Sequence, residues 1–226
     1  MSIDVDNIET NPALAKLTTG ERLQLRQSAT MLQRRWQGRL NIETIERFMA
    51  ESVDMLLPTA KVTRWLPVIV EELTNDRLRA LVRLETPRTD LNPSLLFLCV
   101  HNAGRSQMAA GWMRYLAGSQ VDVFSGGSEP ATDLNAAAVA AMAEKGIDIS
   151  RELPQPWADE VVRAADVVVT MGCGDACPVF PGKRYLDWEL DDPSGKTVEE
   201  VRPIRDAIEQ RVRGLLAELG VNPVAA

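Results

Sequence analysis

Short apolar runs alternate with helical stretches after residue 94, and this alternation constrains the fold more strongly than any other feature of the sequence. The runs expected to be strands cover residues 95–98, 121–125, 167–171 and 184–186. The stretches expected to be helices cover residues 106–117, 134–145, 157–164 and 198–219. Such an alternation predicts an α/β fold, a parallel sheet that helices cover on both faces. A functional site in such a sheet lies beyond the carboxyl ends of the strands.

Residues 18–85, in contrast, show only helical patterns. A first helix is expected over residues 21–40, with an inward stripe at Leu25, Ala29, Leu32, Trp36 and Leu40. A second is expected between a cap at Asn41 and Pro58, with its stripe at Ile45, Phe48, Met49, Ser52 and Leu56. A third is expected from about residue 64 to 84, with Trp65, Ile69, Leu73 and Leu81 inward. Three amphipathic helices with short connections predict a small three-helix bundle.

A linker is expected between these two parts. The segment ETPRTDLNPS, residues 85–94, contains two prolines and no periodic pattern. We therefore expect two domains, a helical domain over residues 1–90 and an α/β domain over residues 91–226.

The charge is unevenly distributed. The first 90 residues carry thirteen basic and thirteen acidic side chains, whereas residues 91–226 carry twelve and nineteen, which accounts for the whole net charge of −7. An acidic domain has no positive field to attract phosphates, so nucleic acid is not expected as a partner. No apolar run approaches the roughly 20 residues that cross a bilayer, and the acidic N-terminus lacks the pattern of a secretory signal. We expect a cytoplasmic protein with no membrane partner.

The strongest chemical signal is the segment CVHNAGRS, residues 99–106, where a cysteine closes the first expected strand and Arg105 and Ser106 open a helix. Loop amides and a helix N-terminus together form a cradle of donors for a tetrahedral anion. The same donors favour the nucleophilic thiolate of Cys99. The predicted oxyanion-binding residues are Val100, His101, Asn102, Ala103, Gly104, Arg105 and Ser106.

Individual residues of this loop have separate expected uses. Gly104 permits a tight turn before the helix. Arg105 offers a planar fork that binds two anion oxygens at once, and Ser106 can donate a hydrogen bond to the thiolate. His101, the only histidine in the chain, is either a base or a residue that shapes the loop, and we favour the second interpretation.

Two further segments supply candidate catalytic groups. The segment Asp191-Asp192-Pro193 is either an ordinary turn or the source of a proton for a leaving oxygen. Cys173 and Cys177 follow the third expected strand, four positions apart between glycines and a proline. In a chain without an export signal they are expected to be working thiols, and a loop that changes shape suits disulfide exchange. The alternatives are incidental buried thiols or half of a zinc site.

The motif CVHNAGRSQMAAGWMR resembles the phosphate loop of the low-molecular-weight tyrosine phosphatase family, and specifically its arsenate reductase branch. The resemblance continues through FSGGSEP, KGIDIS, VVVTMGCGDACP and DWELDDPSGK, and so covers residues 94–220. It implies a four-stranded parallel sheet, a loop-ordering role for Asn102, and Asp192 rather than Asp191 as the acid. Several relatives carry a glutamate of a potassium site where this chain has Ala110, so we predict no metal and no cofactor.

The function expected from this resemblance is reduction of arsenate to arsenite. Cys99 would attack arsenate, Cys173 would release arsenite by forming a disulfide with Cys99, and Cys177 would take over that disulfide for reduction by thioredoxin. The alternatives are a plain tyrosine phosphatase, a reductase that uses mycothiol or glutaredoxin, and a non-enzymatic arsenite sensor. The helical domain resembles, more weakly, a segment of some actinobacterial reductases. It is expected either to form a homodimer or to pack against the catalytic half, and we favour the homodimer.

Overall fold

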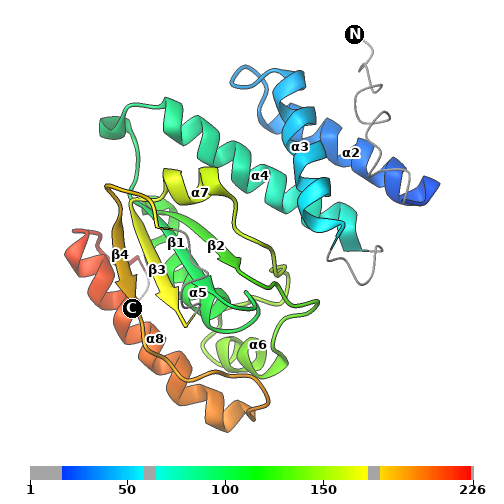
Figure 1. Cartoon of the computed structure of the whole chain (residues 1–226). Helices are drawn as coiled ribbons and strands as arrows, with labels where there is room; N and C mark the ends of the chain where they lie inside the picture. Colours follow the sequence, from blue (N-terminus) through cyan, green and yellow to red (C-terminus); the bar gives the residue numbers. More distant parts are fainter. Residues whose placement is uncertain (1–16, 59–64, 173–178, 225–226) are drawn as a thin grey trace. The chain divides into compact units, whose positions relative to one another are not determined.

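The computed structural model describes residues 17–58, 65–172 and 179–224, and the chain divides into two compact units, Met1–Val82 and Arg83–Ala226 (Figure 1). None of the helices in these ranges combines the length and apolar character that a bilayer-spanning segment needs.

The first unit contains the three expected helices, α2 (Thr19–Arg35), α3 (Ile42–Leu56) and the greater part of α4 (Leu66–Glu85). The helix α2 starts with a capping box in which the side chains of Thr18 and Glu21 each bond the other residue's backbone N–H. The predicted cap of α3 is confirmed, because the side chain of Asn41 accepts a hydrogen bond from Thr44 N. Apolar side chains of all three helices share one buried core.

One expected core residue is wrong. Trp65 is 50% exposed, whereas Leu73 is buried as expected and Ile69 and Leu81 are partly buried against the core. The cause is the position of the helix start. Helix α4 begins at Leu66, so Trp65 precedes it, and the inward stripe runs through Leu66, Val70, Leu73 and Leu78.

The second unit is built on the predicted four-stranded parallel sheet. Its strands are β1 (Ser94–Cys99), β2 (Asp122–Gly127), β3 (Val167–Met171) and β4 (Arg184–Asp187), in the order β2-β1-β3-β4. The register aligns Cys99 with Gly127 on one side and with Met171 on the other. The carboxyl ends of β1, β2 and β3 therefore meet at one edge of the sheet, where Cys99 lies.

Four helices accompany this sheet: α5 (Arg105–Ala117), α6 (Ala136–Ala143), α7 (Asp159–Ala164) and α8 (Val198–Glu218). Short 3-10 helices cover Arg88–Asp90 and Gly118–Gln120. Leu95, Phe97 and Cys99 of β1 share a core with side chains of α5, α6 and α8, whereas α7 contacts β1. The helices α5 and α6 both pack against the long helix α8, which runs beside the sheet in Figure 1.

Candidate active site

The predicted nucleophile lies at the junction of β1 and the loop that leads to α5. Cys99 is the last residue of β1 and is only 3% exposed. Its Sγ lies 3.0 Å from Ser106 Oγ and accepts a hydrogen bond from Asn102 N at 3.2 Å. The thiol is thus held at the start of the loop, where it is placed to act as a nucleophile.

Asn102 holds the loop in shape from a fully buried position. It adopts a left-handed backbone conformation with φ of 47°, which asparagine tolerates better than most residues. Its Nδ2 donates to Ser106 Oγ at 2.9 Å, while its Oδ1 accepts from Gln107 Nε2 at 3.1 Å and from Gln155 N at 3.0 Å. The loop is thereby tied to α5 and to the segment before α7.

The carbonyl groups of the loop bond a neighbouring segment of the chain. Those of Cys99, Val100, His101 and Ala103 accept hydrogen bonds from backbone N–H groups of residues 128–135 at 2.8–3.3 Å. In a trans peptide the N–H of the next residue points opposite to the carbonyl. The N–H groups of Val100, His101, Asn102 and Gly104 therefore point away from residues 128–135, which leaves them available to an anion.

Gly127 is needed for this arrangement. A Cβ atom at Gly127 would lie 2.6 Å from Val100 O and 2.9 Å from Asn102 N, so only glycine lets the loop approach the end of β2. The FSGG segment thus shapes the cradle, a function that the sequence pattern alone did not indicate.

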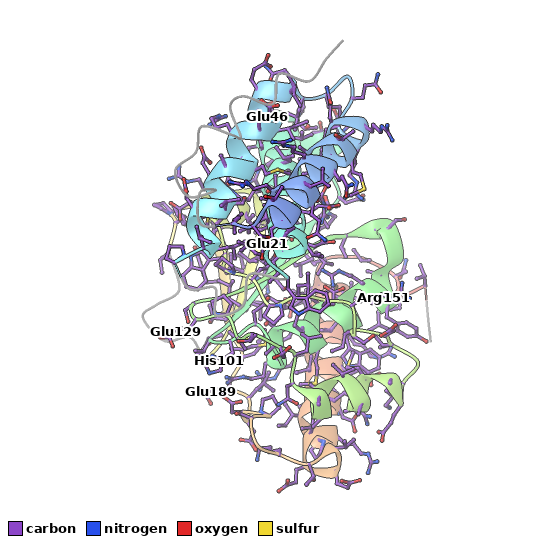
Figure 2. All side chains as sticks on the ribbon, turned by 90° about the vertical axis from the view of Figure 1, so that its right-hand side faces the viewer. Glu21, Glu46, His101, Glu129, Arg151 and Glu189 are labelled. Carbon is purple, nitrogen blue, oxygen red and sulfur yellow. The ribbon has the colours of Figure 1, made fainter. Side chains whose placement is uncertain are left out.

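His101 contacts the segment that follows β2. Its Nδ1 lies 3.0 Å from the carbonyl oxygen of Glu129, its own carbonyl accepts from Ala131 N, and its side chain is exposed (Figure 2). These contacts support the interpretation of His101 as a residue that shapes the loop.

Arg105 and Asp192 meet at the mouth of the cradle. Arg105 Nη2 donates to Asp192 Oδ2 at 2.9 Å, and Ser194 N donates to Asp192 Oδ1 at 2.9 Å. Both Asp191 and Asp192 are exposed, but of the two it is Asp192 that lines the pocket. Of the two aspartates, Asp192 is therefore the one placed to exchange a proton with a bound oxyanion.

The cradle opens into a cavity of about 180 Å³. It is lined by Cys99, His101, Ala103, Gly104, Arg105, Ala131, Asp133, Asn135, Asp192, Pro193 and Ser194. No aromatic side chain other than the His101 imidazole stands among these described lining residues, so the walls offer no apolar ring to stack on a phenyl ester. The described ranges also hold no group of three or more His, Cys, Asp or Glu side chains that could bind a metal ion.

The two remaining predicted catalytic residues, Cys173 and Cys177, lie outside the described residues. The residue just before them is described. Gly172 has φ of +75°, and a Cβ atom there would lie 2.8 Å from Arg105 Nη1. Gly172 therefore lies directly beside the guanidinium of Arg105.

Several polar residues of the site were not predicted, among them Gln107, Asn135 and Gln155. Gln107 and Gln155 bond Asn102, and Asn135 lines the cavity. Gln107 offered a local signal, since it directly follows the predicted loop. The other two lie far from the motif in sequence and offered none.

Comparisons with known proteins agree with this geometry. Residues 94–224 match the low molecular weight phosphotyrosine protein phosphatase family. A solved structure, the thioredoxin-dependent arsenate reductase Cg_ArsC1' of Corynebacterium glutamicum, is 42% identical, has a TM-score of 0.74, and aligns over 87% of this chain and 96% of its own.

Curated relatives match the second unit. An arsenate reductase of Halalkalibacterium halodurans is 42% identical over 136 residues, which are 56% of this chain and 96% of the relative. A putative arsenate reductase of Halobacterium salinarum is 39% identical over 132 residues, 56% of this chain and 92% of the relative. Residues 25–82 match the N-terminal domain of protein-tyrosine-phosphatase-like proteins. The chain therefore belongs to the low molecular weight phosphotyrosine protein phosphatase family, and carries in addition the N-terminal helical domain found in phosphatase-like proteins.

Proposed function

We propose that this protein is an enzyme that reduces arsenate to arsenite, with Cys99 as nucleophile and thioredoxin as the source of electrons. The observation that carries the proposal is the convergence of the Cys99 thiol, the loop amides and Arg105 on one small cavity. The arsenate reductases among its relatives support arsenate as the substrate.

The first step is substitution at arsenic. Arsenate binds through the loop amides and the planar fork of Arg105. Cys99 Sγ forms a bond to arsenic while one arsenic–oxygen bond breaks. That oxygen is a hydroxyl of the hydrogen arsenate ion; it takes one proton from Asp192 and leaves as water, because hydroxide is a poor leaving group.

The second step is the reduction itself, which uses the remaining thiols. The thiolate of Cys173 attacks Cys99 Sγ, the sulfur–arsenic bond breaks, and its electron pair stays on arsenic, which leaves as arsenite. Cys177 then attacks Cys173, so that Cys99 is released as a thiolate and the disulfide passes to Cys173 and Cys177. A thioredoxin dithiol reduces this bond and becomes a disulfide itself. Such exchange needs the reducing conditions of the cytoplasm, where we place the enzyme.

The test is arsenate-dependent NADPH oxidation with thioredoxin and thioredoxin reductase. Wild type should turn over repeatedly, Cys177→Ser should stop after one arsenite per enzyme, and Cys173→Ser should release none. Repeated turnover by Cys173→Ser would contradict the relay. If the wild type hydrolyses aryl phosphate but never reduces arsenate, the protein is a phosphatase. If it reduces arsenate only with glutaredoxin or mycothiol, thioredoxin is not its electron donor.

We further propose that the helical domain forms a homodimer. On α2, the side chains of Leu23 and Met31 are 54% and 50% exposed, two turns apart. Apolar groups presented in this way favour contact with another protein surface. A double replacement of Leu23 and Met31 by glutamate should convert a dimer into a monomer in light scattering, and a wild-type monomer would contradict the proposal.

A further inference from the structure

Asn135 connects three parts of the active site, although no step of the proposed reaction uses it. Its backbone N donates to Ala103 O in the oxyanion loop at 2.9 Å. Its side-chain Oδ1 accepts from Ala138 N at 2.8 Å and so caps α6. Its Nδ2 donates to the carbonyl oxygen of Pro193 at 3.0 Å, directly after the proposed acid.

The loop that carries Asp192 needs such a connection. The Asp192 side chain is 51% exposed, and its bond to Arg105 competes with the anion that Arg105 is expected to bind. When an oxyanion takes the guanidinium, the hydrogen bond from Asn135 to Pro193 still holds the acid loop beside the cradle. Pro193 also lies against Gly104, since a Cβ at Gly104 would be 2.6 Å from Pro193 Cγ.

We propose that Asn135 is a positioning residue that keeps Asp192 within reach of the leaving oxygen after the anion has displaced Asp192 from Arg105. The inference rests on the proposed function, in which Asp192 donates that proton. Asn135 acts through the Pro193 carbonyl, so it should affect proton transfer more strongly than binding of the anion.

The variant that separates these effects is Asn135→Ser. Serine retains an oxygen that can cap α6, but it lacks the Nδ2 donor toward Pro193. We expect the kcat of arsenate reduction to fall about tenfold. This is a part of the roughly 10²–10⁴-fold rate enhancement that a general acid contributes, because the acid would be misplaced and not removed. The inhibition constant of inorganic phosphate should change less than about threefold, because the cradle donors remain. The matched control is Asn41→Ser, which makes the same change at the cap of α3 and should leave both values unaltered.

A double-mutant cycle distinguishes positioning of the acid from general damage. In an Asp192→Asn background, Asn135→Ser should lower kcat no further, because the group that it positions is already absent. Additive losses, or a phosphate affinity that falls tenfold while kcat is unchanged, would overturn the proposal.

A measurement without turnover keeps the two proposals separate. If wild type reduces no arsenate, the proposed function fails, but the position of the acid loop can still be followed by amide hydrogen exchange over residues 191–196 with phosphate bound. Asn135→Ser should speed this exchange at least about fivefold and Asn41→Ser should not. Unchanged exchange in Asn135→Ser would refute the positioning role whatever the activity.

Discussion

Arg105 and Asp192 form an ion pair across the mouth of the oxyanion cradle, with Nη2 and Oδ2 2.9 Å apart. The Arg105 side chain is only 10% exposed, so its guanidinium has lost most of its water and uses the carboxylate as a partner. A tetrahedral anion that enters the cradle presents the same kind of oxygen. Asp192 therefore occupies a donor that the substrate needs.

Replacing Asp192 with asparagine should have opposite effects on binding and on turnover. Without the competing charge, inorganic phosphate should bind about two- to fivefold more tightly, which corresponds to the roughly 0.4–1 kcal/mol of an exposed pair. Without the proton donor, kcat for arsenate should fall about 100-fold or more. Phosphate inhibition and steady-state kinetics measure the two effects. Asp191→Asn is the control, because Asp191 does not line the cavity. Weaker phosphate binding by Asp192→Asn would contradict the competition between Asp192 and the anion for Arg105.

Substitution of Gly172 should weaken anion binding as much as substitution of a residue of the cradle itself. Alanine there places a Cβ 2.8 Å from Arg105 Nη1 and also occupies a left-handed backbone conformation. We expect Gly172→Ala to displace the guanidinium and to weaken phosphate binding about tenfold. Isothermal titration with phosphate measures this change.

The matched control is Gly182→Ala. Gly182 has nearly the same conformation, with φ of +77°, but a Cβ atom there would meet nothing within 4 Å. Gly182→Ala should therefore destabilise the fold by about 1 kcal/mol and leave phosphate affinity unchanged. Equal losses of affinity in both variants would show that backbone strain, rather than contact with Arg105, is the cause.

The sequence predicted the parts of the site that depend on local order. Cys99 and Arg105 belong to one strand-loop-helix segment, so their spacing alone brings them to a common cradle. The strands were also predictable, because their buried apolar runs are continuous. Trp65 was predicted wrongly because an apolar pattern does not fix the residue at which a helix starts, and a shift of one position turns a side chain out of the stripe.

The contacts that hold the site together could not be predicted in this way. Gln155 bonds Asn102 from 53 positions away, and Asn135 bonds Pro193 from 58 positions away. Periodicity reports which face of an element is buried, but not which distant loop a polar side chain meets. Arg83 shows the same limit, since in the helical pattern it was indistinguishable from a solvated residue.

Arg83 is a buried charge that holds together the amino ends of strands in the second unit. It donates to Asp122 Oδ2 at 2.8 Å, to Asp166 Oδ2 at 2.7 Å and to backbone carbonyls of Ala164 and Asn92. It precedes our expected domain boundary at residue 90, yet it belongs to the unit Arg83–Ala226. A catalytic fragment that starts at residue 91 would lack it.

Replacing Arg83 with methionine should lower the free energy of unfolding by roughly 2–4 kcal/mol. This loss is somewhat smaller than for a fully buried pair, because the side chains of Asp122 and Asp166 remain 38% and 28% exposed. Urea unfolding of the whole chain measures this loss. Arg88→Met is the control, since Arg88 is 75% exposed and forms a 3.3 Å ion pair with the same Asp166. It should cost about 0.5 kcal/mol or less. Similar losses in the two variants would argue against the role of Arg83.

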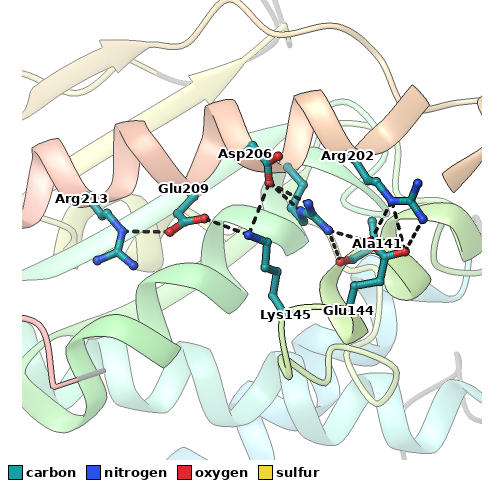
Figure 3. A network of polar contacts seen from close by, with 8 residues as sticks. Ala141, Glu144, Lys145, Arg202, Asp206, Glu209 and Arg213 are labelled. Carbon is teal, nitrogen blue, oxygen red and sulfur yellow. Dashed lines mark hydrogen bonds and ion pairs between the residues drawn. The ribbon is translucent and has the colours of Figure 1, made fainter. Parts of the chain in front are cut away.

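Glu144 makes the attachment of α6 to α8 sensitive to acid. It follows the last residue of α6 and accepts hydrogen bonds from Arg202 Nε at 2.9 Å and Nη2 at 2.6 Å and from Arg205 Nη1 at 2.9 Å (Figure 3). The hydrogen bonds from Arg202 above all lower the pKa of Glu144 from 4.5 to about 2. Desolvation by burial opposes this shift, and the bond from Arg205 adds to it.

Because this pKa is lower in the folded state than in the unfolded one, the ionised carboxylate stabilises the fold fully above about pH 4.5, and this contribution is lost as the pH falls through about 2. Glu144→Gln should therefore be less stable than wild type at pH 6, and the difference should shrink steadily between pH 4.5 and pH 2.5. Urea unfolding at several pH values measures both curves, with Glu43→Gln, an exposed glutamate of the other unit, as the control. A difference that stayed constant down to pH 2.5 would mean that the arginines do not hold the carboxylate ionised.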